Sequence, residues 1–334
     1  MRVRHLPSAA TLVAFLAFAC PSAAEPSPLS PTFAYDYGAT NTPRSLGVGA
    51  MHALGAGLTA VFLNPANLGL TRAYHAGALA QFTPEGARQL YGGAVMDSTR
   101  RFAGGMSFIG GFQDPDGIDR TTVDARAAIA FAASKLFHLG LGGRYLTVEQ
   151  DGLGPLGNSR ASGGLVDPED APHVSGAPGR KKMLGTFTFD AGATIRLIEA
   201  LSISAYGHNL TYRDDGLLPM VVGGGVGFGN ADLSVEVDAE ADLTTYEKAS
   251  PRIMAGAEYL VAGRVPVRAG YRLDTMGGPM DGASHESSGG LGYVEPRYGV
   301  EASVRRTVTG PEATMIAVSV TYHIDSLGLP VQSL

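Results

Sequence analysis

The feature that most constrains the fold of this chain is a strict alternation of apolar and polar residues. In residues 231–242, every second side chain from Ala231 to Ala241 is apolar, and every side chain between them is polar. Residues 186–196 and 313–324 show the same period of two. This period indicates β-strands with one apolar and one polar face. Because a soluble β-sandwich also alternates, the spacing of the turns must decide between fold classes.

About fourteen candidate strands follow Thr71, each of roughly ten residues, the length that crosses a bilayer at the usual tilt. They start near Ala73, Arg88, Phe102, Thr121, Phe137, Leu184, Ala200, Pro219, Ala231, Pro251, Val265, Ser287, Arg297 and Glu312. Short connections, such as residues 99–101 and 262–264, alternate with longer ones, such as residues 151–183. One connection, at Pro84 to Ala87, is short although it falls among the long ones.

Short turns at one end and long loops at the other are typical of an outer-membrane barrel. The sequence therefore predicts an all-β fold, a transmembrane antiparallel β-barrel of about 14 strands at residues 73–324. The short turns and both termini would be periplasmic, and the tail at residues 325–334 would be short and periplasmic. A secreted soluble β-sandwich or barrel is the alternative.

Glycine pairs lie inside several of these strands, among them Gly92-Gly93, Gly104-Gly105 and Gly142-Gly143. Glycine weakens a strand unless the backbone must bend or be approached closely. A barrel wall around an inserted segment needs both, so the glycines agree with a barrel that encloses part of its own chain.

Residues 1–24 have the pattern of a secretory signal. Arg2 and Arg4 precede an apolar stretch from Ala9 to Cys20, and small residues at 22–24 offer a cleavage site. Cleavage there would remove Cys20, the one cysteine of the chain. A lipoprotein site at Cys20 is the alternative, but Phe18 stands where such a site has a small residue. We expect the mature chain to begin at Glu25, with a plug or hatch segment at residues 25–72.

The stretch TAVFLNPANLGL, residues 59–70, places an Asn64-Pro65-Ala66 corner between two apolar runs and ahead of the first strand. Pro65 restricts Asn64 to extended conformations, and the Asn64 side chain can bond to the backbone where the chain turns. Asn-Pro is also a common turn dipeptide. Because the segment is too apolar to stand free in the periplasm, we expect it to lie inside the barrel.

At this point the chain resembles the FadL/PorV group of outer-membrane proteins, in which a run similar to A-L-G-x-G leads to an N-P-A-x-L motif. The resemblance covers about 27 residues and the strand count. It implies a plug inside the lumen and one of two functions: a FadL-like channel for uptake of hydrophobic small molecules, or a PorV-like barrel subunit that serves protein secretion or a cell-surface machine. The matching residues are Leu46, Gly47, Gly49, Asn64, Pro65, Ala66 and Leu68.

The polar faces of the later strands carry opposite charges that would face one enclosed lumen. Unpaired charges in a narrow lumen are costly, so we expect many of them to pair across strands. A salt-bridged lumen without a ligand and a substrate path both remain open. The lumen charges are Glu236, Asp238, Glu240, Arg252, Glu258, Arg268, Arg272, Glu301 and Arg305.

No enzyme activity, metal or other cofactor is expected. The sequences at 285–288 and 206–209 contain residue types found in hydrolases, but catalytic triads are defined by geometry and such composition is common. Without Arg2 and Arg4 the chain has 23 basic and 31 acidic residues, a formal charge of −8, which disfavours nucleic acid. Expected partners are outer-membrane lipid, lipopolysaccharide near the basic residues 180–182, hydrophobic small molecules, and a protein of a secretion or surface machine.

Overall fold

The structure is a computed structural model that describes residues 40–113, 120–151, 180–211, 218–244, 249–275, 283–309 and 313–324. The predicted signal, the part of the predicted plug segment before Thr40 and the predicted tail at residues 325–334 lie outside these ranges. Within them, no helix is long and apolar enough to cross a membrane.

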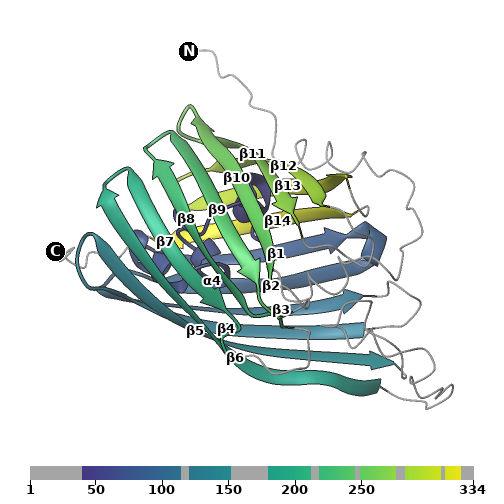
Figure 1. Cartoon of the computed structure of the whole chain (residues 1–334). Helices are drawn as coiled ribbons and strands as arrows, with labels where there is room; N and C mark the ends of the chain where they lie inside the picture. Colours follow the sequence, from purple (N-terminus) through teal and green to yellow (C-terminus); the bar gives the residue numbers. More distant parts are fainter. Residues whose placement is uncertain are drawn as a thin grey trace.

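Fourteen antiparallel strands form a closed barrel, in which consecutive strands pair and β1 pairs with β14 (Figure 1). This confirms the predicted all-β barrel. The strands are β1 (Tyr74–Thr83), β2 (Arg88–Asp97), β3 (Phe102–Gln113), β4 (Arg120–Ala132), β5 (Phe137–Asp151), β6 (Arg180–Ile198), β7 (Leu201–His208), β8 (Val221–Gly229), β9 (Leu233–Asp242), β10 (Ser250–Val261), β11 (Val265–Asp274), β12 (Ser284–Val294), β13 (Tyr298–Thr309) and β14 (Thr314–Ile324).

The observed strand starts lie within four residues of the predicted ones. The largest difference is at β6, which begins at Arg180 rather than at Leu184. After a register shift at Val148/Glu149, residues 149–151 and 180–182 continue the pairing of β5 with β6. The hairpin is therefore longer than the hydrophobic alternation indicates.

The short connections gather at one end of the barrel, at the left in Figure 1, which we call the short-turn end. The opposite, long-loop end carries the connection from β1 to β2. There a single turn of 3₁₀ helix, η3 (Pro84–Gly86), leads to Ala87 in a left-handed conformation at φ 43°. The short connection at Pro84 to Ala87, which falls among the long ones in the sequence, is thus a tight turn at the long-loop end.

The two faces of the wall have the predicted register. Val237 is 50% exposed on the outside, whereas Glu236 and Asp238 are 1% and 0% exposed and face the lumen. Large apolar side chains such as Phe108, Phe187 and Val320 also lie on the outside. An apolar outer wall around a polar lumen is the arrangement of a transmembrane barrel.

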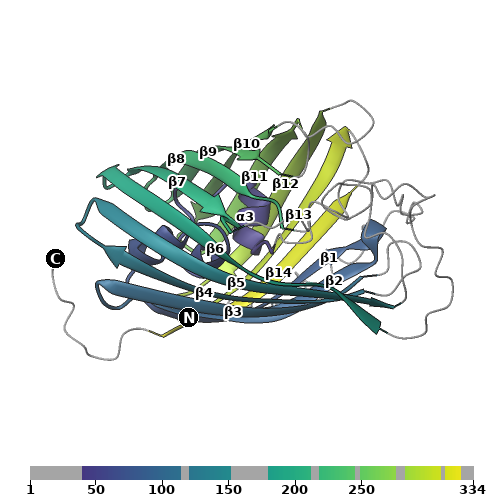
Figure 2. The same cartoon turned by 60° about the horizontal axis from the view of Figure 1, so that its bottom comes forward.

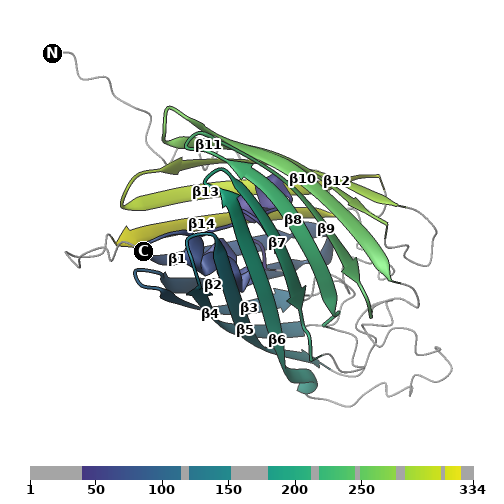
Figure 3. The same cartoon turned by 60° about the vertical axis from the view of Figure 1, so that its left-hand side comes forward.

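Residues 40–72 lie inside the barrel, where the helices appear in purple between the walls in Figures 2 and 3. They include α3 (Pro43–Val48), α4 (Thr59–Phe62) and the 3₁₀ helix η2 (Pro65–Leu70). Helix α3 packs against β10 to β14, and η2 packs against β3 to β6. The segment thus spans the lumen between opposite walls, and we call residues 40–72 the plug.

Candidate functional site: the plug and the lumen charges

The Asn64-Pro65-Ala66 corner is fully enclosed. Asn64 is extended at φ −146°, as expected before proline, and Pro65 is the first residue of η2. The Asn64 side chain accepts from the Ala66 N–H at 3.1 Å and donates to the His52 carbonyl at 2.8 Å. It also donates to Thr194 Oγ1 of β6 at 3.2 Å. The corner therefore caps one helix, ties two parts of the plug together and contacts the wall.

Two glycines of the wall lie directly against this corner. A Cβ atom added to Gly140 of β5 would collide with the backbone of Pro65 and Ala66, and one added to Gly192 of β6 would collide with the Asn64 side chain. Leu68 is fully buried and packs with Phe62 and with side chains of β1 to β4. Glycines of the wall thus admit the inserted segment here, although Gly140 and Gly192 are not among the glycine pairs named in the sequence.

The remaining residues of the predicted motif lie in or beside α3. Leu46 is buried against Met315 and Ala317 of β14. The Gly47 carbonyl accepts from Ser288 Oγ of β12 at 3.0 Å. Gly49 ends α3 in a left-handed conformation at φ 76°, which glycine adopts without steric cost. The structure thus places all seven motif residues in the lumen, at two separate points of contact with the wall.

Two of the predicted lumen charges hold the plug backbone between these points. Asp238 Oδ2 accepts from the N–H groups of Met51 and His52 at 2.9 and 3.1 Å. Glu236 accepts from the N–H groups of Ala53 and Leu54 at 2.6 and 2.9 Å. Four consecutive backbone donors of the plug therefore bond to two buried carboxyl groups of β9, which need such partners when they are removed from water. We call these contacts the β9 anchor.

Around the β9 anchor lies a group of rings and carboxylates. The His52 ring bonds through Nδ1 to Asp238 Oδ2 at 2.8 Å and stacks on Tyr206 with 3.9 Å between ring centroids. The Tyr206 hydroxyl donates to Glu240 Oε2 at 2.9 Å. His208 pairs with Asp190 at 3.3 Å. Tyr206 and His208, considered for catalysis in the sequence, therefore contribute to packing and charge pairing in the lumen.

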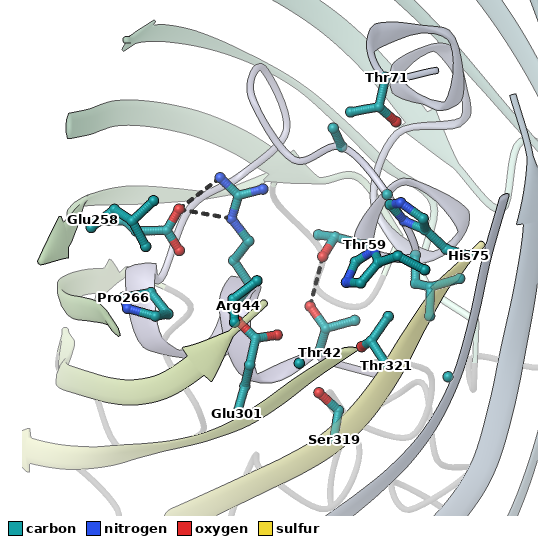
Figure 4. Close-up of a pocket in the computed structure, with 18 of the residues that line it drawn as sticks. Thr42, Arg44, Thr59, Thr71, His75, Glu258, Pro266, Glu301, Ser319 and Thr321 are labelled. Atoms are coloured by element: carbon teal, nitrogen blue, oxygen red, sulfur yellow. Dashed lines mark hydrogen bonds and ion pairs between the residues drawn. The ribbon is translucent and has the colours of Figure 1, made fainter. Parts of the chain in front are cut away.

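The other predicted charges form two clusters. The short-turn ion cluster contains Glu258, Arg268 and Glu301, and the plug adds Arg44 to it. Glu258 receives Arg44 at 2.8 Å and Arg268 at 2.6 Å on its two oxygens, and Arg268 also pairs with Glu301. Figure 4 shows Arg44 reaching from the plug to Glu258.

The long-loop ion cluster contains Glu240, Arg252, Arg272 and Arg305 among the predicted residues. Arg252 bridges Glu240 at 2.6 Å and Asp274 at 2.8 Å. Arg272 and Arg305 both reach Glu286, at 2.8 and 3.0 Å. The expected pairing across strands is present in both clusters.

Several further residues face the lumen or hold the plug, although the sequence did not identify them. Asp124 of β4 pairs with Arg126 at 2.9 Å and with Arg144 of β5 at 2.8 Å, and Arg126 also donates to the Phe62 carbonyl of the plug at 3.1 Å. The side chain of Asn67 shares one hydrogen-bond acceptor with Asn64, since it also donates to the His52 carbonyl, at 2.9 Å. The inward positions of Asp124 and Arg126 follow from the alternation in β4, which could have identified them. Asn67 and His52 carry no comparable signal in the sequence.

Two cavities lie on either side of the plug. The short-turn cavity, of about 350 Å³, is lined by Arg44, Thr59, His75, Glu258 and other residues near the short turns. The long-loop cavity, of about 130 Å³, is lined by Ser45, His52, Arg126, Arg252 and neighbouring residues. Adjacent plug residues Arg44 and Ser45 face different cavities, so α3 forms part of the partition between them.

The comparisons with known proteins concern the fold. No protein-family model and no curated protein matches this sequence. Among solved structures, the CymD monoaromatic hydrocarbon channel superposes with a TM-score of 0.63 and 14% identity, over 84% of this chain and 96% of CymD. A Pseudomonas aeruginosa FadL homologue gives 0.61 and 16%, over 85% and 98%. The Ralstonia pickettii toluene transporter TbuX gives 0.57 and 14%, over 85% and 97%.

These structures define the class of fold: a closed antiparallel barrel similar to those of the CymD channel and of a FadL homologue. The likeness spans nearly the whole length of each of the three proteins. At 14 to 16% identity it establishes the architecture of this chain and leaves its substrate to be argued from the lumen.

Proposed function

We propose that this chain is an outer-membrane channel of the FadL type for the uptake of hydrophobic small molecules. The observation that carries the proposal is a closed barrel with an apolar outer wall whose lumen is occupied by its own N-terminal segment. Proteins that share this fold include a monoaromatic hydrocarbon channel and a toluene transporter. Outer-membrane lipid and lipopolysaccharide are the partners that such a location implies, and a hydrophobic solute is the cargo.

The same comparisons favour uptake over the PorV-like alternative. The solved structures of similar fold cited above are described as channels or transporters, or as a FadL homologue. The lumen also carries a cavity on each side of the plug, which a passage requires and a scaffold does not. A role in secretion or in a surface machine has no comparable observation behind it.

Passage requires the partition between the two cavities to open. Helix α3 carries Arg44, which pairs with Glu258 of the wall, and Gly47, which contacts β12. We propose that displacement of α3 from β10 to β14 joins the short-turn cavity to the long-loop cavity. The β9 anchor and the Asn64 corner would hold the rest of the plug during this movement.

A disulfide across this contact tests the proposal. A Cβ atom at Gly47 would lie 2.7 Å from Ser303 Oγ of β13, so cysteines at both positions have Cβ atoms near the separation that a disulfide needs, about 3.5 to 4.5 Å. We expect Gly47→Cys/Ser303→Cys to take up a labelled aromatic hydrocarbon or fatty acid slowly when oxidised and normally when reduced. Each single-cysteine variant is the matched control.

The measurement is uptake by intact cells whose own hydrophobic-compound channels have been deleted. Equal uptake with and without the wild-type protein would refute transport of that probe. Equal uptake by the oxidised and reduced double variant, with the disulfide verified by mass spectrometry, would refute movement of α3 while leaving transport in place.

A further inference from the structure

Two histidines face each other across the seam that closes the barrel. His75 is the second residue of β1 and His323 the penultimate residue of β14, and they are direct partners in the register of the two strands. Their ring centroids are 4.3 Å apart and the ring planes are nearly perpendicular, at 87°. The seam therefore brings two imidazoles together that are 248 positions apart in the sequence.

Both rings border the short-turn cavity of about 350 Å³. The plug meets the pair at Gly57, since a Cβ atom there would lie 3.2 Å from His75 Nδ1. Figure 4 shows His75 beside Thr59 at the edge of this cavity. A solute or ion that enters from the short-turn end thus reaches the histidine pair without crossing the plug.

The spacing of the rings suits a shared metal ion. An ion about 2.0 to 2.1 Å from one nitrogen of each ring lies about 3.2 Å from each centroid, so the centroids would be roughly 4.5 to 5.2 Å apart for bond angles of 90 to 110°. The observed 4.3 Å requires the rings to part by less than about 1 Å. Small side-chain rotations can supply this because both rings border open space.

We propose that His75 and His323 form a binding site for a divalent transition-metal ion at the short-turn mouth of the lumen. Neutral imidazole is a good ligand for Zn²⁺, Ni²⁺ and Cu²⁺, whereas Mg²⁺ and Ca²⁺ prefer oxygen. The described residues contain no group of three or more His, Cys, Asp or Glu side chains placed to share an ion. Cavity water therefore completes the coordination, and the site exchanges its ion readily rather than holding it permanently.

Such an ion would link the first strand of the barrel to the last one. It would also lie beside Gly57 of the plug, whose left-handed conformation at φ 71° tolerates a side chain poorly. The site is independent of the proposed cargo, because it lies at the seam and needs no hydrophobic solute. Binding should stabilise the folded barrel by mass action, to an extent that rises with ion concentration.

The test uses the full mature protein without a polyhistidine tag, folded in detergent. We expect Zn²⁺ to bind with one-to-one stoichiometry in calorimetry at pH 7.5 and to raise the temperature at which the folded electrophoretic band is lost. His75→Gln and His323→Gln should each weaken Zn²⁺ affinity at least tenfold and abolish the thermal shift. Mg²⁺ should produce neither effect, because it prefers oxygen ligands.

His285→Gln is the matched control, since His285 lies near the long-loop end, bonded to Tyr271. This variant should bind Zn²⁺ as the wild type does. Cu²⁺ should give an electron paramagnetic resonance spectrum with couplings from imidazole nitrogen that disappears in the double variant His75→Gln/His323→Gln. Absence of Zn²⁺ binding to folded wild-type protein, or unchanged binding to the folded double variant, would overturn the proposal.

Discussion

At the scale of single residues, two acidic side chains of β9 have a role that their position in the alternating pattern does not reveal. The alternation indicates only that Glu236 and Asp238 face the lumen, where a cross-strand arginine would be their usual partner. Instead they accept hydrogen bonds from four consecutive plug N–H groups. The sequence could not show this, because backbone donors have no signature in side-chain identity. The same limit explains why His52 was overlooked.

The first prediction concerns Asp238→Asn. The amide keeps the size of the side chain but removes the charge, which weakens the three bonds that Oδ2 accepts from Met51 N–H, His52 N–H and the His52 ring, and it places a buried NH₂ group at the position of Oδ1. Leaving a buried group unpaired costs about 1 to 3 kcal/mol. We expect amide hydrogen exchange at residues 51–54 to accelerate about 5- to 100-fold while the barrel stays folded. Asp232→Asn, in an exposed turn, is the control; equal exchange in both variants would contradict the β9 anchor.

The second prediction concerns Asn64 and Asn67, which donate to the same His52 carbonyl. Asn64→Ala should lower the free energy of plug opening by roughly 1 to 3 kcal/mol, and Asn67→Ala should act similarly. Because the two side chains share an acceptor, the effects should not add in the double variant. Hydrogen exchange at residues 52–66 measures all three. Strictly additive losses would mean that the corner is held by unrelated contacts.

At the scale of elements, the strands were predictable and the plug contacts were not. A period of two fixes which face of a strand meets lipid, so the register of β9 and β14 could be read from residues such as Val237 and Val318. The start of β6 was misplaced because pairing beyond a bulge depends on the partner strand rather than on hydrophobic alternation. The path of residues 40–72 across the lumen depends on contacts far apart in sequence, which no local pattern encodes.

The third prediction tests the faces of these strands. Val237→Arg and Val318→Arg place a charge on the lipid-facing wall, at a cost of about 2 to 4 kcal/mol near the membrane midplane. Both should reduce the fraction of folded barrel in membranes. Glu236→Gln, one residue away but facing the lumen, should be milder for insertion. Comparison of boiled and unboiled samples by electrophoresis measures the folded fraction, and the opposite order of effects would mean that the register is wrong by one residue.

The fourth prediction uses the glycines where the plug meets the wall. A Cβ atom at Gly256 of β10 would collide with the Val48 carbonyl at the end of α3, whereas one at Gly104 of β3 has its nearest neighbour at 3.9 Å. Gly256→Ala should therefore push α3 away from the wall and increase proteolysis or exchange at residues 43–48. Gly104→Ala should leave α3 in place. If both variants protect α3 equally, the close contact at Val48 does not hold the plug.

At the scale of the whole molecule, the barrel and its plug have separable roles. The wall is closed by continuous pairing between all fourteen strands, including β1 with β14, and these bonds do not involve the plug. The plug contributes the partition between the short-turn and long-loop cavities. The barrel should therefore assemble without the plug, although the buried charges that face it would then be solvated by water entering the lumen.

The last prediction follows from this separation. Deletion of residues 46–68 removes the C-terminal half of α3, the partners of the β9 anchor and the Asn64 corner, so the two cavities should merge into a water-filled passage. We expect stable ionic current through single deletion barrels in planar bilayers, and little current through the wild type. The oxidised Gly47→Cys/Ser303→Cys variant, whose plug is retained and cross-linked, should also remain closed. A heat-dependent mobility shift must first establish that each barrel is folded. Equal, near-zero currents from the folded deletion variant and the folded wild type would show that other parts of the chain close the lumen, and that residues 46–68 are not what blocks the passage of ions.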